Sequence, residues 1–254
     1  MKTVRQLIAL LSILAIPMLP SAAPADQLTV SAAASLADAF RSIGPLFEAC
    51  RPGLTVRFNF AASGVLLQQI AQGAPVDVLA SADQETMQQG IERELLDGET
   101  RQDFAGNALV LIEPARDGPM LADLDGLRSN RVRRIAVGKT DTVPAGRYTR
   151  QALDSAGLWS VLQPKLIQAN SVRQVLDYVG RGEVDAGFVY RTDAALMPDR
   201  VRVAAPAPGH APIRYPAAMV SDSRQKAAAR EFLQFLQSAQ AQDTLRRYGF
   251  TEAR

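Results

Sequence analysis

Residues 28–49 read LTVSAAASLADAFRSIGPLFEA, and this stretch decides the expected fold. Leu28–Ala32 is a short apolar run of the kind that forms a buried strand. The segment 36–49 then carries apolar side chains at helical spacing, at Leu36, Ala39, Phe40, Ile43 and Phe47. Tiny residues join the two segments, so the stretch predicts a strand, a tight turn and a helix. Units of this kind build parallel sheets with helices on their faces.

The same alternation continues along the chain. We expect further strands at 54–60, 76–80, 108–112, 134–137, 186–190, 201–204 and 213–220. We expect further helices at 64–72, 84–90, 121–127, 146–156, 172–180, 225–237 and 241–247. Two breaks interrupt the pattern, at 104–107 and in the Pro/Gly/Ala-rich stretch 204–212. The sequence therefore predicts an α/β fold in which two crossovers join lobe one (26–105 and 210–254) to lobe two (106–209), each lobe a mostly parallel sheet flanked by helices.

The first 25 residues are set apart from this fold. Lys2 and Arg5 precede an apolar stretch from Leu7 to Ile16, and Ala23-Pro24-Ala25 supplies small residues for cleavage. This order is typical of a secretory signal peptide, so we expect residues 1–25 to direct export and Asp26 to begin the mature chain.

Charge and composition narrow the class of function. Lys2 and Arg5 are the only charged residues of the leader, so the remaining 229 residues carry 26 basic and 26 acidic side chains. A neutral chain has no overall field to attract nucleic acid, and an anion site in it must be built from local dipoles. One cysteine, Cys50, allows no internal disulfide, and one histidine, His210, allows no His-rich metal site.

Two serines occupy strand-to-helix turns in lobe one. Ser35 follows three alanines, and Ser63 follows Ala61 and Ala62. Ligands of open α/β sheets bind at the carboxyl ends of the strands, where helix N-termini present unpaired N–H groups and a partial positive charge. Both serines are therefore candidate anion ligands through their hydroxyl and N–H groups. The alternative is that each serine only caps the helix that follows it.

Lobe two has comparable candidates at Ala145, Val172 and Tyr190. Ala145 lies in a Val-Pro-Ala-Gly turn before a helix, Val172 begins another helix, and Tyr190 ends a buried strand. The first two would offer backbone N–H groups, and the third would offer a hydroxyl. The alternatives are a proline that merely starts a helix, a Ser171 that merely caps one, and a tyrosine that fills the core.

Five stretches together resemble the periplasmic molybdate-binding proteins of molybdate ABC importers. They occur in the family's order over nearly the whole mature chain, as SAAASLADA (31–39), FAASG (60–64), GAPVDVLASAD (73–83), VPAG (143–146) and GFVY (187–190). Two positions depart from the family pattern. Ala62 stands where some members have serine, and Ser171 stands where an acidic residue often precedes the valine.

The resemblance implies a two-lobed periplasmic-binding-protein fold that closes on molybdate, and on the similar tungstate, before delivery to a membrane permease. Carried over residue by residue, the ligand contacts are Ser35, Ser63, Ala145, Val172 and Tyr190. The resemblance also implies a monomeric periplasmic receptor, not an enzyme, without a cofactor, without a nucleic-acid partner, and with molybdenum held only through its oxyanion.

Molybdate near neutral pH carries no proton and can only accept hydrogen bonds, so a site of neutral donors suits it. Phosphate keeps a proton that such a site cannot accept. Sulfate also lacks a proton, and its rejection depends on cavity size, which the sequence does not show. A receptor for sulfate or another small oxyanion therefore stays open. Two further alternatives remain open. One is a serine hydrolase that uses Ser35 or Ser63 as nucleophile, for which His210 is the only histidine that could act as base. The other is a sensor domain of a membrane kinase.

Overall fold

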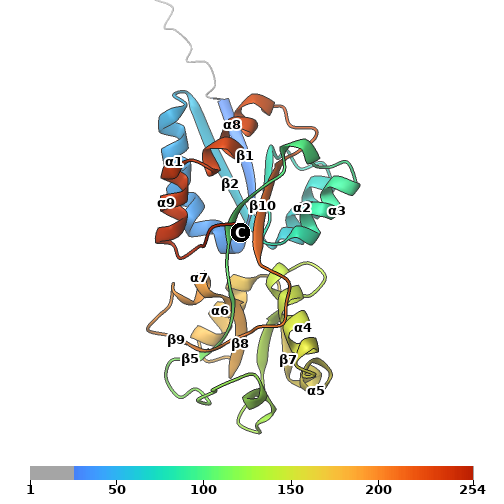
Figure 1. The fold of residues 1–254 in the computed structure, drawn as a ribbon, viewed down its shortest axis with the longest axis vertical. Helices are drawn as coiled ribbons and strands as arrows, with labels where there is room; N and C mark the ends of the chain where they lie inside the picture. The colour runs from blue at the N-terminus through green and yellow to red at the C-terminus, as the bar shows by residue number, and fades with distance from the viewer. Residues whose placement is uncertain (1–25, 254) are drawn as a thin grey trace, which may run out of the picture.

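The computed structural model describes residues 26–253, so the predicted signal peptide at 1–25 lies outside the described residues. Two lobes are stacked along the long axis of the molecule, and each is built on a five-stranded sheet (Figure 1). The expected α/β fold of two lobes joined by two crossovers is confirmed. Within residues 26–253, no helix is long and apolar enough to cross a membrane.

The sheet of lobe one has the strand order β2-β1-β3-β10-β4. Its strands are β1 (Asp26–Ala33), β2 (Leu54–Ala61), β3 (Val78–Ala80), β4 (Gln102–Gly106) and β10 (Arg214–Met219). Parallel pairing joins β1 to β2 and β3, whereas β10 is antiparallel to both of its neighbours. Four of the five strands therefore run in one direction, as expected of a mostly parallel sheet.

Helices cover both faces of this sheet. They are α1 (Ala37–Cys50), α2 (Ser63–Ala71), α3 (Gln84–Glu92), α8 (Lys226–Leu236) and α9 (Ala239–Arg247). Helices α1, α8 and α9 pack together on one side, where Phe40, Phe47 and Phe232 meet edge to face. Helices α2 and α3 bury Leu66, Leu67 and Met87 on the other side.

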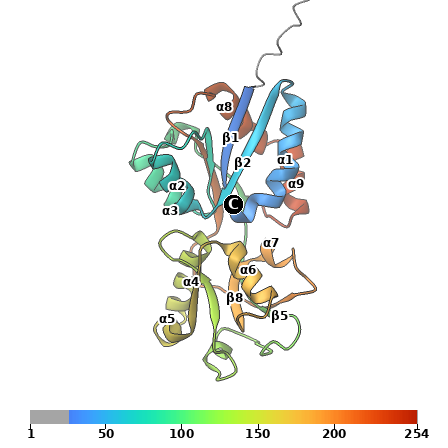
Figure 2. The same cartoon turned by 180° about the vertical axis from the view of Figure 1, so that it is seen from behind.

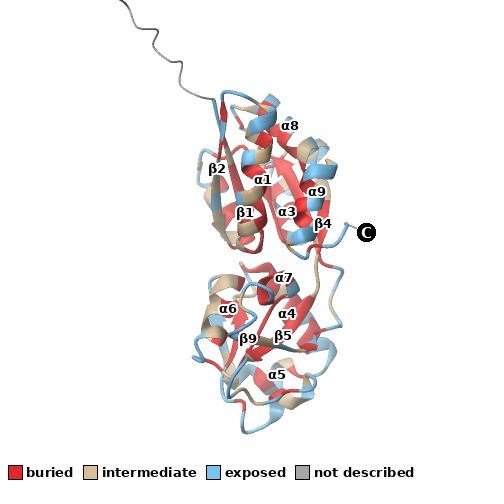
Figure 3. Ribbon diagram, turned by 90° about the vertical axis from the view of Figure 1, so that its left-hand side faces the viewer, coloured by how far each residue is buried: buried red, intermediate tan, exposed pale blue. Residues whose placement is uncertain are grey.

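The sheet of lobe two has the order β7-β6-β8-β5-β9, again with one strand reversed, here β5. Its strands are β5 (Leu109–Pro114), β6 (Ile135–Gly138), β7 (Leu166–Ala169), β8 (Ala186–Tyr190) and β9 (Val201–Pro206). Its helices are α4 (Pro144–Ser155), α5 (Trp159–Leu162), α6 (Val172–Gly180) and α7 (Arg191–Ala194). Buried residues fill the sheet and the inner helix faces of each lobe (Figure 3).

The chain crosses between the sheets twice, from β4 to β5 and from β9 to β10. These segments lie side by side, because Asn107 N–H donates to the Ile213 carbonyl at 3.3 Å. The C-terminal end joins them through a bridge between Gly106 and Thr251. Both crossings fall close to the predicted joints, while the exact lobe boundaries at 105/106 and 209/210 remain our proposal.

One expectation about secondary structure is wrong. The helix expected at 121–127 is absent, and only a 3-10 turn, Asp125–Arg128, forms there. Leu121 and Leu127 are buried as expected of apolar residues, but the Asp123 side chain accepts from Gly126 N–H and favours a turn. Strand β4, whose end falls within the joint 104–107, was not predicted. Strand β7 was not predicted, because Leu166–Ala169 is an exposed edge with little apolar pattern.

Candidate functional site

Four strand-to-helix turns converge where the lobes meet. In lobe one they follow β1 and β2, and in lobe two they precede α4 and α6. Figure 2 shows α4 and α6 in the lower lobe with their starts close to the upper lobe. All four turns lie at carboxyl ends of strands, the edge at which open α/β sheets bind ligands.

A small, nearly closed cavity of about 10 Å³ lies between these turns. All five residues predicted as ligand contacts line it, and all are at most 4% exposed. Apolar residues complete the wall: Ala33, Ala34, Ala62, Ala82, Val143 and Pro144. Since pockets for drug-sized ligands span about 300–1,000 Å³, this cavity excludes ligands of that size.

Neither serine of the cavity caps a helix, so the alternative interpretation of Ser35 and Ser63 is wrong. Ser35 lies within a 3-10 turn, Ala34–Leu36, and Ser63 is the first residue of α2; neither helix start has a side-chain cap. Instead, Ser63 Oγ accepts from Ala82 N–H at 3.0 Å, and Ser35 Oγ lies 3.1 Å from Tyr215 Oη. An amide N–H can only donate, so the Ser63 hydroxyl proton stays free for a ligand.

Tyr190 reaches across the cleft from the end of β8. Its hydroxyl donates to the Ala82 carbonyl at 3.3 Å, which is long for an O–H···O bond and leaves the proton able to turn to a ligand. Burial, aided by Tyr215, Tyr148 and nearby carboxylates, raises the pKa of Tyr190 well above its usual value. The hydroxyl therefore remains protonated, and thus a donor, throughout the physiological pH range.

Ala145 and Val172 contribute backbone groups. They are the second residue of α4 and the first residue of α6, where N–H groups have no partner within the helix. Pro144 is the first residue of α4, and Ser171 caps α6 through Gln174 N–H, as the alternative interpretations have it. Both roles are compatible with the neighbouring N–H groups of Ala145 and Val172 facing a ligand. No residue lining the cavity is charged, and its polarity comes from hydroxyl groups and helix dipoles.

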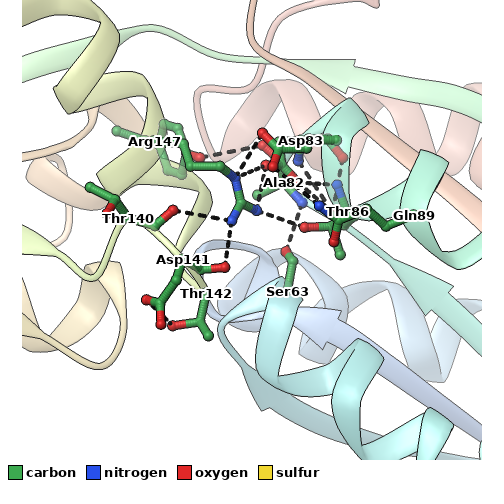
Figure 4. A network of polar contacts seen from close by, with 12 residues as sticks. Ser63, Ala82, Asp83, Thr86, Gln89, Thr140, Asp141, Thr142 and Arg147 are labelled. Carbon is green, nitrogen blue, oxygen red and sulfur yellow. Dashed lines mark hydrogen bonds and ion pairs between the residues drawn. The ribbon is translucent and has the colours of Figure 1, made fainter.

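A first arginine clasp closes one side of the cavity. Arg147 of α4 contacts Asp83 at 2.6 Å and donates to Thr86 Oγ1 at 2.7 Å, both across the cleft in lobe one (Figure 4). The same guanidinium donates to the carbonyls of Thr140 and Asp141. Asp83 also caps α3 through Thr86 N–H. Arg147 is thus turned away from the cavity and neutralised.

A second clasp closes another side of the cleft. Arg173 of α6 contacts Asp38 of α1 at 2.7 Å and Asp193 of α7 at 2.6 Å. Asp193 is fully buried, and burial raises its pKa to about 6 although Arg173 and Tyr190 N–H stabilise the carboxylate. Burial lowers the pKa of Arg173, but pairing with Asp193 and Asp38 outweighs it, so the net pKa is raised and the cation persists.

The sequence interpretation missed both arginines. A signal was present, because Arg147 and Arg173 follow closely after Ala145 and Val172 in the first turns of α4 and α6. A cation near a helix N-terminus opposes the helix dipole, so it points to a compensating carboxylate. The identity of that carboxylate depends on how the lobes close, which no local pattern reveals.

The serines lack the partners of a catalytic nucleophile. Within residues 26–253, neither hydroxyl pairs with a histidine or a carboxylate. His210 lies instead in the second crossover, with its ring 5.4 Å from the Tyr148 ring. It lines a different, wider hollow of about 620 Å³ at the two crossovers, far larger than a small ion needs. Among the described residues, neither serine therefore has the general base that a nucleophilic hydroxyl requires.

Comparison with known proteins agrees with this geometry. A family model described as bacterial extracellular solute-binding protein matches residues 28–251. The chain is 37% identical to the molybdate-binding protein ModA of Escherichia coli (strain K12), covering 89% of each chain. It is 36% identical to a putative ABC transporter substrate-binding lipoprotein, YvgL, of Bacillus subtilis (strain 168), covering 88% of this chain and 86% of that protein. The solved periplasmic molybdate-binding protein of Azotobacter vinelandii superposes with a TM-score of 0.78 at 27% identity, covering 89% of this chain and all of that one.

Proposed function

Since the chain belongs to the family of bacterial extracellular solute-binding proteins, we propose that it is a receptor that binds molybdate, and also tungstate, for an ABC importer. Residues 1–25 direct its export to the periplasm, where it works as a monomer. The ligand lies in the cavity between the lobes, and the closed protein delivers it to the membrane permease.

The observation that carries this proposal is the uncharged, donor-rich lining of the cavity. Ser35, Ser63 and Tyr190 offer hydroxyl protons, while Ala145 and Val172 offer backbone N–H groups at helix starts. No carboxylate lines the cavity, so a protonated anion would find no charged acceptor. An unprotonated tetrahedral dianion satisfies such a site, because every one of its oxygens accepts.

Neutral donors are also suited to reversible capture. Four helix or turn N-termini place partial positive charge around the ligand without a fixed cation in its contact shell. The cationic side chains nearby, Arg147 and Arg173, are paired with carboxylates across the cleft. These ion pairs therefore help to retain the ligand by stabilising the closed form, and not by contacting the ligand directly.

Isothermal titration calorimetry of the mature protein with molybdate, tungstate, sulfate and phosphate tests the proposal. We expect tight binding of molybdate and tungstate, weaker binding of sulfate, and none of phosphate. A sulfate affinity above that of molybdate would make the chain a sulfate receptor instead. Absence of binding by all four anions would remove the oxyanion assignment altogether.

A further inference from the structure

We propose that Asn107 and Tyr215 are positioning residues that force the Ser35 hydroxyl to donate into the cavity. Neither residue lines the cavity. Asn107 lies in the first crossover, and Tyr215 lies on β10, directly after the second. The inference rests on the proposed function, because it takes Ser35 as a donor to a bound oxyanion.

The orientation of the Asn107 amide follows from its neighbours. Its Oδ1 lies 2.9 Å from the Ala108 backbone nitrogen, which can only donate, so this atom is the amide oxygen. The amide nitrogen therefore faces the other two partners, Thr192 Oγ1 at 2.9 Å and Tyr215 Oη at 3.2 Å. Asn107 thus donates to Tyr215, and the reverse direction is not available.

The direction of the next bond is then determined. Tyr215 is fully buried, and its hydroxyl accepts from Asn107, so its single proton needs an acceptor. Ser35 Oγ, at 3.1 Å, is the acceptor that the structure provides. If Ser35 donated instead, the Tyr215 proton would be buried without a hydrogen-bond partner, which is strongly unfavourable. Burial also raises the pKa of Tyr215 well above its usual value, so that proton stays in place.

Ser35 therefore accepts from Tyr215 and keeps its own proton for the ligand. These hydrogen bonds form a one-way relay, in which the Asn107 amide donates to the Tyr215 hydroxyl, Tyr215 donates to the Ser35 hydroxyl, and Ser35 donates to the anion. Ser63 is oriented similarly by the Ala82 N–H. Unlike the Ala82 N–H, which lies in lobe one with Ser63, Asn107 also donates to Thr192 of lobe two. The relay to Ser35 therefore depends on both lobes and on the crossovers between them.

Tyr215→Phe tests the relay with little change of packing, since the ring still lies against Phe250 at 5.3 Å and Tyr190 at 5.8 Å. We expect molybdate affinity to fall by up to about tenfold, because the Ser35 hydroxyl remains but no partner holds its proton toward the ligand. Affinity for arsenate, a tetrahedral oxyanion that keeps a proton near neutral pH, should fall less or rise, because the freed Ser35 hydroxyl can now accept. A merely structural role would lower both affinities alike.

Two further variants complete the test. In a Ser35→Ala background, Tyr215→Phe should have little additional effect on molybdate affinity. Asn107→Asp should reproduce the loss, because a carboxylate at this position accepts from Tyr215 and reverses the relay. Tyr248→Phe is the matched control, since it removes a Tyr–Ser hydrogen bond of 2.8 Å, to Ser42, on the α1–α9 side of lobe one.

Calorimetry with molybdate and arsenate gives both affinities for each variant, and thermal melting confirms that each is folded. Wild-type molybdate affinity in Tyr215→Phe, or losses that multiply in the Ser35→Ala double variant, would overturn the relay while leaving the proposed function intact. Failure of the unmodified protein to bind molybdate would instead count against the proposed function.

Discussion

The Arg147 guanidinium lies 2.6 Å from the Asp83 carboxylate, and this pair joins the two lobes beside the ligand cavity. Both side chains are largely buried, at 11% and 4% exposure. If the lobes open to admit the ligand, as the proposed function requires, this pair must separate and each side chain becomes solvated. Forming a buried ion pair changes the free energy little, because it offsets the cost of removing two charges from water, whereas burying one of the two charges alone is strongly unfavourable. Removing one partner of the Arg147–Asp83 pair should therefore shift the equilibrium from the closed toward the open form.

Arg147→Met should weaken molybdate binding by about ten- to a hundredfold, or about 1.4–2.8 kcal/mol, because closure then buries Asp83 without its cation. Calorimetry and small-angle X-ray scattering would show the lost affinity and a larger fraction of open protein. Arg150→Met is the matched control on the same helix. It removes an exposed pair with Asp154, at 55% and 51% exposure, of the kind that contributes little. Equal affinities of the two variants would rule out a role for the clasp in closure.

The sequence predicted those site residues that can be recognised from their immediate neighbours in the chain. Ser35 and Ser63 stand out because tiny residues precede a hydroxyl between a strand and a helix, and Tyr190 stands out because it ends a buried strand. All three line one cavity. Tyr215, by contrast, meets Ser35 across 180 residues. That contact depends on how β10 pairs with β3 and β4 after the second crossover. No pattern around residue 215 encodes such a register.

The limits of local sequence patterns also explain the error in the predicted secondary structure. The expected helix at 121–127 rested on the spacing of leucines that are indeed buried, but turn-forming Gly126 and Asp123 decide the backbone there. Local apolar periodicity reports burial, and it reports secondary structure only where the intervening residues also favour a helix.

Ser63→Ala should reduce molybdate affinity by about 1–3 kcal/mol, because it removes a donor to the anion and leaves the Ala82 N–H without its acceptor. Calorimetry measures the change. Ser238→Ala provides the comparison, since Ser238 caps α9 through Ala241 N–H in lobe one. It should lower the stability of the fold by about 1 kcal/mol without changing affinity. Unchanged affinity of Ser63→Ala would remove Ser63 from the ligand shell.

Asp193 should make stability depend on pH. Burial raises its pKa from 3.8 to about 6, so between these values the folded protein holds a proton that the unfolded chain has released. The contribution of this group to the free energy of unfolding therefore falls as pH rises from about 4 to 6, by at most about 1.4 kcal/mol per pH unit, and is constant above. Urea unfolding of the wild type and Asp193→Asn at several pH values gives the difference. A difference that rises with pH over this window would contradict the raised pKa.

Gly64→Ala should separate ligand affinity from the stability of the unliganded protein. Gly64 N–H donates to the Thr142 carbonyl of lobe two at 3.0 Å, and a Cβ at position 64 would meet that oxygen at 2.8 Å. The obstacle is backbone, so it cannot turn aside, and the lobes must stay further apart. In an open form the added methyl is harmless and favours α2, since alanine stabilises a helix over glycine by about 0.5–1 kcal/mol.

We therefore expect molybdate affinity to fall at least about tenfold, a loss of about 1.4 kcal/mol, while the melting temperature without ligand is unchanged or higher. Gly98→Ala, whose Cβ would meet only the flexible Ile91 side chain of the same lobe, should retain wild-type affinity. Retained affinity in Gly64→Ala would mean that ligand binding does not require the close approach of α2 to Thr142.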